Sequence, residues 1–144
     1  MTEKWIFGND VDALADAHKI RRIVFMGEQN VSEEEEMIAW EDEISTHLVL
    51  YLEDGTAVAT GRVMAKDGSH ILGRIAVLKE FRGRHFGKMI TQRLVEKSLK
   101  MGAVEVVLSS QTHAKTFYEQ LGFTAFTDVY MDAGIPHVSM KLTR

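Results

Sequence analysis

The chain has 144 residues, a formal net charge of −4, 45% hydrophobic residues and no cysteine. This length predicts one domain spanning residues 1–144, and the missing cysteines exclude disulfides, thiolate metal sites and a cysteine nucleophile. An acidic chain with no membrane-length apolar run and no secretory signal pattern favours a cytoplasmic protein that binds neither nucleic acid nor membrane.

The first 45 residues are predicted to be helical and rich in charge. A helix is expected from about Val11 to Phe25, because apolar residues recur on one face at the helical period. Arg21 falls within that apolar face, and a buried or half-buried arginine there needs a partner. The run Glu33-Glu34-Glu35-Glu36 follows Ser32 with capping-box spacing and is interpreted as a solvent-exposed helix start.

Three apolar-rich segments then predict an antiparallel meander. They span His47 to Leu52, Thr56 to Met64 and Ile71 to Leu78. The turn signals Asp54-Gly55 and Asp67-Gly68 separate them, as is typical between antiparallel neighbours. We therefore expect these three strands to lie side by side in one sheet.

The second half of the chain alternates helices and strands. An amphipathic pattern predicts a helix from about Lys88 to Met101. The remaining elements are expected to be a strand, a helix and two strands, at Val104 to Leu108, Ala114 to Leu121, Thr124 to Met131 and His137 to Leu142. Together these elements predict an α+β fold with a mixed, mainly antiparallel sheet flanked by helices.

A basic loop with two glycines leads into the helix predicted at Lys88. It reads Arg82-Gly83-Arg84-His85-Phe86-Gly87. Free N–H groups and the positive end of the helix dipole attract anions at a helix start, and glycines let an anion approach the backbone closely. A pyrophosphate would fit there. The spacing matches neither a dinucleotide-binding nor a P-loop fingerprint, and a basic capping loop without a ligand is the alternative interpretation.

With Ile75-Ala76-Val77 before it, this loop resembles the acetyl-CoA motif of the GNAT superfamily, Arg/Gln-x-x-Gly-x-Gly/Ala. The segment from Ala114 to Phe123 is similar to the Ala-x-x-Phe-Tyr-x-x-x-Gly-Phe segment of that family. Two further stretches, Arg21 to Gln29 and Asp132 to His137, resemble the ElaA/YjcF-like subgroup. His85 stands at the first motif glycine, where its side chain could crowd a pyrophosphate, force an altered turn or donate a hydrogen bond to phosphate.

The resemblance implies an N-acetyltransferase of the GNAT fold that moves an acetyl group from acetyl-CoA directly to a primary amine in a ternary complex. The cosubstrate, acetyl-CoA before transfer and CoA after it, would be bound by Ile75, Ala76, Val77, Arg82, Gly83, Arg84, His85, Phe86, Gly87, Lys88 and Ala114. A backbone N–H of the strand would stabilise the oxyanion. Tyr118 would be the general acid for the departing thiolate.

Several residues are candidates for the base that deprotonates the amine. Glu28, His47, Asp132 and His137 are the candidates, and histidine is favoured because it titrates near neutral pH. The acceptor is expected to contact Arg21, Glu28, Asp132 and His137. No closely spaced ligand pair accompanies the two histidines, so no metal site is predicted.

Two other functions compete with catalysis. His85 at a glycine position would suit a CoA-binding or sensing module that has lost turnover. The acidic segment from Glu33 to Glu43 would suit a protein-interaction domain on the same scaffold. The acceptor could be a small molecule or a peptide amine, and a homodimer is the expected form if the chain associates.

Overall fold

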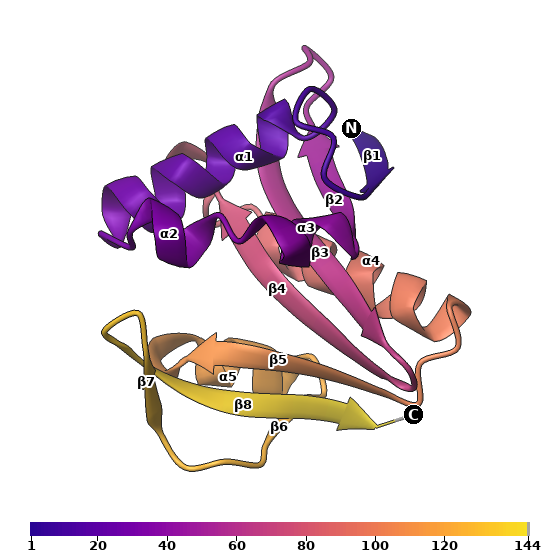
Figure 1. The fold of residues 1–144 in the computed structure, drawn as a ribbon, viewed down its shortest axis with the longest axis vertical. Helices are drawn as coiled ribbons and strands as arrows, with labels where there is room; N and C mark the ends of the chain where they lie inside the picture. The colour runs from indigo at the N-terminus through magenta and orange to yellow at the C-terminus, as the bar shows by residue number, and fades with distance from the viewer. Residues whose placement is uncertain (144) are drawn as a thin grey trace.

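An eight-stranded sheet runs through residues 1–143, the part of the chain that the computed structural model describes (Figure 1). The strands are β1 (Thr2–Phe7), β2 (Ser45–Tyr51), β3 (Ala57–Lys66), β4 (Ser69–Val77), β5 (Glu105–Gln111), β6 (Thr124–Ala125), β7 (Tyr130–Asp132) and β8 (Ile135–Thr143). The helical segments are α1 (Ala15–Arg21), the π-helical η1 (Arg22–Glu28), α2 (Glu33–Glu36), α3 (Ala39–Glu43), the 3₁₀ turn η2 (Lys79–Phe81), α4 (Phe86–Lys100), the 3₁₀ turn η3 (Thr112–Ala114) and α5 (Lys115–Gln120). Over the same residues, no helix has the length and apolar character needed to cross a membrane.

The sheet divides into two arms because β4 and β5 pair over part of their length. The strand order is β1-β2-β3-β4-β5-β8-β6, with β7 on β8. β4 and β5 are parallel partners over residues 69–72 and 105–108, and beyond these residues the two strands diverge (Figure 1). The first arm therefore contains β1 to β4, and the second contains β5 to β8.

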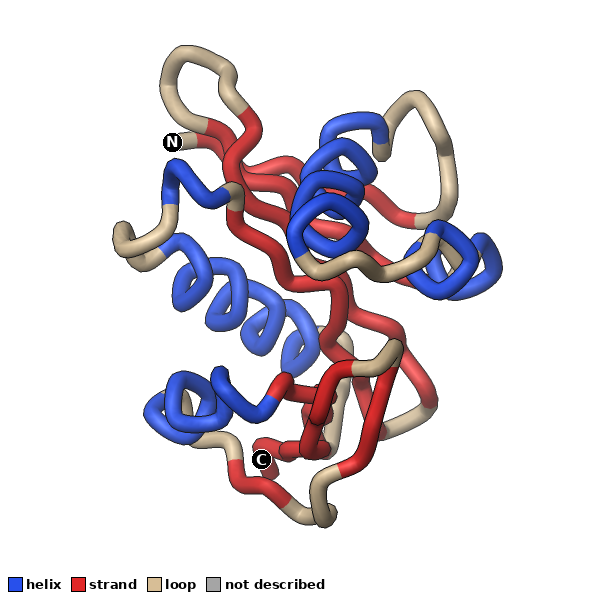
Figure 2. The backbone as a smooth tube through the Cα atoms, turned by 90° about the vertical axis from the view of Figure 1, so that its left-hand side faces the viewer, coloured by secondary structure: helices blue, strands red, loops and turns tan. Residues whose placement is uncertain are grey.

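Helices lie on both sides of the strands (Figure 2). In β2, Leu48 belongs to the core beneath α4, whereas its neighbour Val49 faces α1, because successive side chains point to opposite faces. A Cβ on Gly61 of β3 would lie 2.8 Å from side-chain atoms of Ile90 and Leu94. The glycine is therefore what allows α4 to pack so closely on the sheet.

Most predicted elements are confirmed. The meander is present as β2, β3 and β4, paired antiparallel in the predicted order. The amphipathic helix is α4, which begins at Phe86, two residues before the predicted start. The helix predicted from Ala114 is α5, preceded by the short turn η3. The mixed, mainly antiparallel sheet with flanking helices is the predicted α+β fold.

The N-terminal region differs from the prediction. α1 begins at Ala15 rather than Val11, and at Arg22 it changes into the π-helical η1, which continues to Glu28 instead of ending at Phe25. The sequence pattern also predicts no β1. This edge strand is mostly exposed and therefore carries little of the apolar alternation that marks a half-buried strand.

The strand predicted over Thr124 to Met131 is wrong as a single element. It forms two short strands, β6 and β7, which both pair with β8. Between them, the hydroxyl of Thr127 accepts a hydrogen bond from the Ser139 backbone N–H at 3.0 Å. A side chain thus occupies a position where a continuous strand would place a backbone carbonyl.

The acidic run after Ser32 is partly buried. The predicted capping box is present, since the Ser32 hydroxyl accepts from the Glu35 N–H at 3.1 Å and the Glu35 carboxylate accepts from the Ser32 N–H. Glu36, however, is buried against Arg21, so the expectation of a fully solvated turn is wrong. In the segment from Glu33 to Glu43, the alternative docking face, Asp42 is buried as well, whereas Glu33, Glu34, Glu35 and Glu43 are exposed.

Candidate functional site

A cleft of about 880 Å³ lies between the two arms. Its walls come from β4, the loop before α4, the first turn of α4, α5, the end of β5 and η1. The predicted site residues that line it are Glu28, Ile75, Ala76, Val77, Arg82, Gly83, His85, Phe86, Gly87, Lys88, Ala114, Tyr118, Asp132 and His137. Three other predicted residues, Arg21, His47 and Arg84, lie outside this lining.

The loop before α4 contains two left-handed residues, Gly83 (φ 83°) and His85 (φ 66°). Glycine adopts this conformation readily, whereas a residue with a Cβ does so at a cost of about 1–2 kcal/mol. The first bond of α4 joins the N–H of Met89 to the carbonyl of His85 at 3.0 Å. The N–H groups of the residues between them have no intrahelical partner, so the start of α4 can hydrogen bond to an anion.

The two arginines of this loop have different surroundings. Arg82 donates from Nε to the carbonyl of Val77 at 3.0 Å, and its Nη2 lies 2.9 Å from the carboxylate of Glu28. Arg84 instead places its guanidinium over the ring of Phe81, 5.5 Å from the centroid, as a cation–π contact. Arg82 is therefore the loop arginine that faces the cleft.

The edge of β4 that faces the cleft has backbone groups without a strand partner among residues 1–143. Ala76 and Val77 pair with β3 on their other side, while pairing with β5 ends at Leu72. A bulge at Arg74, whose φ is 51°, interrupts the register with β3. Such an open edge can hydrogen bond to an extended ligand in the way that an added strand would.

Tyr118 projects from α5 into the cleft. Its ring makes edge-on contacts with Phe117 and Phe123, at centroid distances of 5.0 and 6.1 Å. Burial raises the pKa of Tyr118 to about 12, so its hydroxyl is protonated at neutral pH. That hydroxyl makes no hydrogen bond to another described residue, which leaves it available to a ligand.

His137 is 8% exposed and lines the cleft with one free nitrogen. Its Nδ1 lies 2.6 Å from the carbonyl of Ile135, so we assign the proton to Nδ1 and the lone pair to Nε2. Nε2 has no hydrogen-bond partner within residues 1–143. The ring stacks on Tyr130, at a centroid distance of 6.2 Å, which holds its orientation.

A second pocket of about 350 Å³ adjoins the cleft on the side of α2 and α3. The residues that line both spaces are Phe25, Gln29, Glu41, Arg74, Gln111, Asp132 and His137. This second pocket shares His137 with the cleft but none of the residues of the loop before α4. This geometry separates a place for one ligand from a place for another.

Two glutamines connect the arms across the cleft. Gln111 of β5 donates from Nε2 to the side-chain oxygen of Gln29 at 2.8 Å, and its own oxygen lies 2.7 Å from Nε2 of His113. Sequence reasoning missed Gln111 and His113. Gln111 lies at the end of an apolar strand, and no local sequence pattern predicts that its hydrogen-bond partner, Gln29, is 82 residues away.

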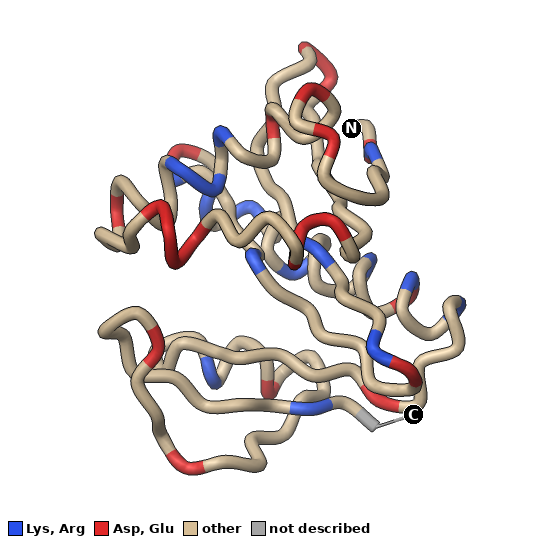
Figure 3. Tube along the Cα trace, viewed as in Figure 1, with Lys and Arg blue, Asp and Glu red and all other residues tan. Residues whose placement is uncertain are grey.

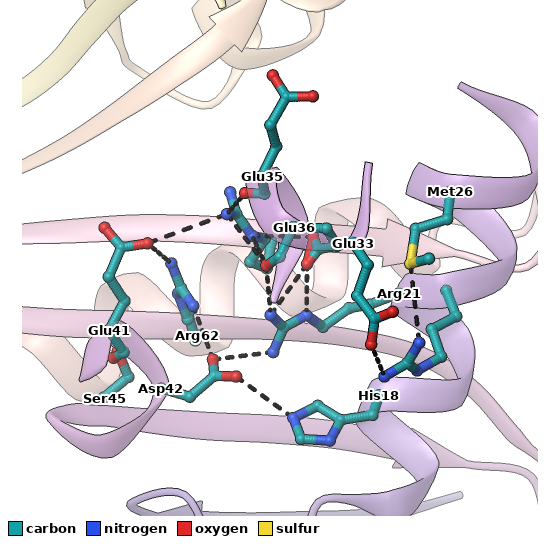
Figure 4. Close-up of polar contacts among 12 residues, drawn as sticks. His18, Arg21, Met26, Glu33, Glu35, Glu36, Glu41, Asp42, Ser45 and Arg62 are labelled. Carbon is teal, nitrogen blue, oxygen red and sulfur yellow. Dashed lines mark hydrogen bonds and ion pairs between the residues drawn. The ribbon is translucent and has the colours of Figure 1, made fainter. Parts of the chain in front are cut away.

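A buried ion cluster holds α1, α2, α3 and β3 together (Figure 4). Arg21 is 1% exposed and contacts the carboxylates of Glu36 and Asp42, each at 2.9 Å. Arg62 adds a second contact to Asp42 at 2.7 Å, and Arg74 of β4 lies 2.9 Å from Glu36. The basic and acidic segments that supply these side chains lie side by side along the first arm (Figure 3).

The electrostatics of this cluster identify a structural role for Arg21. Burial alone would raise the pKa of Asp42, but hydrogen bonds from His18 and Arg21 and the nearby arginine charges hold it well below its usual range. At Glu36 burial prevails and the pKa is raised, although Arg21 and Arg74 offset part of the effect. The prediction that Arg21 needs a partner is confirmed, and its partners are two carboxylates. Its guanidinium is fully engaged away from the cleft.

His47 is also committed to the protein interior. It is buried in β2, and its Nε2 donates to the carbonyl of Asp42 at 3.0 Å. Burial lowers the pKa of His47, which keeps the imidazole neutral. Because His47 does not line the cleft, it is not placed to take a proton from a substrate bound there.

The family follows from comparison with known proteins. Residues 21–144 match the model of the acetyltransferase (GNAT) domain. The chain belongs to the GNAT acetyltransferase family. Membership indicates an acyltransferase that uses an acyl-CoA as cosubstrate, in agreement with the motifs at Arg82 and Tyr118.

Several relatives of this GNAT protein place it in the ElaA/YjcF-like subgroup. It is 39% identical over 139 residues to the uncharacterized N-acetyltransferase YjcF of Bacillus subtilis, which covers 95% of this chain and 97% of that protein. It is 38% identical over 129 residues to the uncharacterized protein YyaT of the same organism, covering 88% and 86%. The crystal structure of Escherichia coli ElaA superposes with a TM-score of 0.87 at 25% identity, covering 99% of both chains.

Proposed function

We propose that this protein transfers the acetyl group of acetyl-CoA directly to a primary amine, with both substrates bound at once. The observation that carries the proposal is the cleft itself. An open strand edge, a basic helix start and the unpartnered hydroxyl of Tyr118 all face one space that a second pocket adjoins. The absence of cysteine supports direct transfer, because the chain has no thiol to carry the acetyl group.

The donor would lie along the first arm. The pyrophosphate would meet the N–H groups at the start of α4 together with Arg82 and Lys88. The pantetheine arm would hydrogen bond to the open edge at residues 75–77, where a backbone N–H can stabilise the oxyanion.

The acceptor would enter from the second pocket, where Asp132 and His137 are placed to receive it. The free Nε2 of His137 takes the proton of the amine, whose nitrogen then attacks the thioester carbon. The carbon–sulfur bond breaks, and the Tyr118 hydroxyl donates to the departing thiolate. Glu28 is paired with Arg82, and His47 and Arg21 lie outside the cleft, so we favour His137 as the base.

The acceptor amine belongs either to a small molecule or to a peptide. The acidic residues that line the second pocket outnumber the arginine Arg74 in the same lining, which favours a cationic amine over a neutral one. They are Glu35, Glu36, Glu41 and Asp132. The homodimer and the cytoplasmic location stay predictions.

The second candidate is a CoA-binding module without turnover. The observation in its favour is His85, which takes a left-handed conformation at a motif glycine position. Such a module would bind CoA and acetyl-CoA equally and release no thiol with any amine. For the interaction-domain alternative, Glu36 and Asp42 are used inside the protein, whereas Glu33, Glu34, Glu35 and Glu43 stay exposed on the surface.

Calorimetric titration with acetyl-CoA, CoA and ATP tests the donor site, and an amine panel with detection of released thiol tests transfer. We expect acetyl-CoA and CoA to bind and ATP to bind far more weakly. Tyr118→Phe should lower turnover by about 10²-fold or more with unchanged donor affinity. Tyr51→Phe is the matched control, since that tyrosine bonds to Asp16 outside the cleft. Full turnover in Tyr118→Phe would remove this residue from the mechanism.

A further inference from the structure

Glu28 places a carboxylate in front of the donor loop. Its two oxygens lie 2.9 and 3.1 Å from Nη2 of Arg82, across 54 residues of sequence. Both residues line the cleft. A carboxylate thus occupies the position beside Arg82 that the proposed function assigns to a phosphate group.

The ion pair between Arg82 and Glu28 is weak enough for Arg82 to change partner. The side chains of Arg82 and Glu28 are 44% and 31% exposed, so solvent screens the pair and its contribution is about 0.2–1 kcal/mol. A doubly charged pyrophosphate offers Arg82 more acceptor oxygens than one carboxylate. The bond from Arg82 Nε to the Val77 carbonyl can persist while Nη2 changes partner.

The side chain of Gln29, next to Glu28 in the sequence, is held from the opposite arm. Gln29 accepts a hydrogen bond from Gln111 of β5 at 2.8 Å. This bridge favours a fixed position of the end of η1 when Arg82 changes partner. When Arg82 turns to another anion, the carboxylate stays in the cleft, next in sequence to Gln29, which lines the second pocket as well as the cleft.

We propose that Glu28 is an internal competitor of the donor pyrophosphate for Arg82, and that donor binding releases its carboxylate toward the acceptor side. Glu28 is then a positioning residue rather than the base, and it sets donor affinity through Arg82. The freed carboxylate attracts the ammonium form of the acceptor, so the donor binds before the acceptor. This inference rests on the proposed function.

Calorimetric titration with CoA of Glu28→Gln, Arg82→Gln and the double variant tests the competition. Glu28→Gln should bind CoA about two- to fivefold more tightly than the natural chain, the factor that corresponds to an exposed ion pair. Arg82→Gln should bind more weakly, and adding Glu28→Gln to it should change nothing further. The coupling between the two substitutions is the readout that a merely structural role would not produce.

Glu3→Gln is the matched control. Glu3 pairs with Arg93 between β1 and α4, with side-chain exposures of 32% and 42%, and neither residue lines the cleft. The substitution changes the net charge equally and should leave CoA affinity unchanged. Thermal melts of all variants verify that each is folded.

The outcomes separate this inference from the proposed function. Unchanged or weaker CoA binding by Glu28→Gln overturns the competition. A gain in CoA affinity that Glu28→Gln also produces in the Arg82→Gln background overturns it too, because the gain would then be a through-space charge effect. Either result leaves the acetyltransferase proposal standing. Absence of CoA binding by the natural chain and every variant would reject both.

Discussion

The ion cluster of the first arm and the loop before α4 use arginine in opposite ways. In the cluster, Arg21 is buried with its guanidinium divided between two carboxylates. In the loop, Arg82 is half exposed and holds a single exchangeable carboxylate. Both arginines lie within motifs that mark the subgroup or the family. The comparison shows that motif membership does not distinguish an arginine that builds the fold from one that meets a ligand.

Burial accounts for the difference. A buried charge must be neutralised permanently, because leaving it unpaired in a low-dielectric interior is far more costly than pairing it. Arg21 therefore fastens α1 to α2 and α3 and so shapes the second pocket. An exposed arginine keeps most of its hydration and can change partners, which is what a cosubstrate site that binds and releases requires.

Arg21→Ala should cause the largest loss of stability. It leaves Glu36 and Asp42 without their shared partner, and breaking a buried pair in this way typically costs about 3–5 kcal/mol. Urea unfolding measures the free energy. The neighbouring Arg22→Ala breaks an exposed pair with Glu33 and should cost less than about 1 kcal/mol. Similar losses in both variants would contradict the contrast between buried and exposed arginines.

Arg82→Ala should show the reverse pattern. CoA affinity should fall by about 10- to 100-fold, the range for a lost charged hydrogen bond, while the free energy of unfolding changes by less than about 1 kcal/mol. Arg84→Ala serves as the control, since Arg84 does not line the cleft and its guanidinium lies over the ring of Phe81. An equal loss of CoA affinity in the Arg84 variant would show that the lining does not identify the ligand-binding arginine.

Local patterns in the sequence were sufficient for much of the fold. The helix α4, the meander and the basic loop each depend on periodicity or composition within a short window. β1 and the π-helical η1 were missed because an exposed edge strand and a change of helix type leave no such pattern. Of the ion cluster, the sequence predicted only that Arg21 needs a partner. It did not identify the other members, because Asp42 lies 21 residues away and Arg62 a further 20.

The candidate site shows the same division. The family motifs located Tyr118 and the loop, and the terminal segment located His137. His47 was interpreted as a candidate base because histidine titrates near neutral pH, but its residue type says nothing about which face of β2 carries it. The contact between Glu28 and Arg82 joins two motifs that are 54 residues apart, so it becomes visible only in the fold.

The pH dependence of stability tests the buried state of His47 in the first arm. Burial lowers its pKa in the folded state below the unfolded value of about 6.5. The folded state then binds fewer protons, so stability is full above about pH 6.5 and is lost as the pH falls below it. Urea unfolding at pH 7.5, 6.5 and 5.5 should show this loss, and His47→Gln should reduce it. An identical pH dependence in the variant would mean that other groups cause it.

His85→Gly should have a small effect on stability and tests the loop before α4. Relief of the left-handed conformation should raise the free energy of unfolding by about 0.5–1 kcal/mol, since the gain is partly offset by the greater backbone entropy of glycine in the unfolded chain. Asp67→Gly is the matched control, because Asp67 has φ 53° in the turn between β3 and β4, outside the cleft. Both variants should gain similar stability, measured by urea unfolding.

CoA titration of the same two variants then separates the roles open to His85. If its side chain crowds the pyrophosphate, His85→Gly binds CoA more tightly, whereas a hydrogen bond from the imidazole to phosphate predicts weaker binding. Asp67→Gly should leave CoA affinity unchanged in either case. An unchanged affinity in His85→Gly would show that the loop binds through its backbone and Arg82 alone, and that this histidine contributes only the shape of the turn.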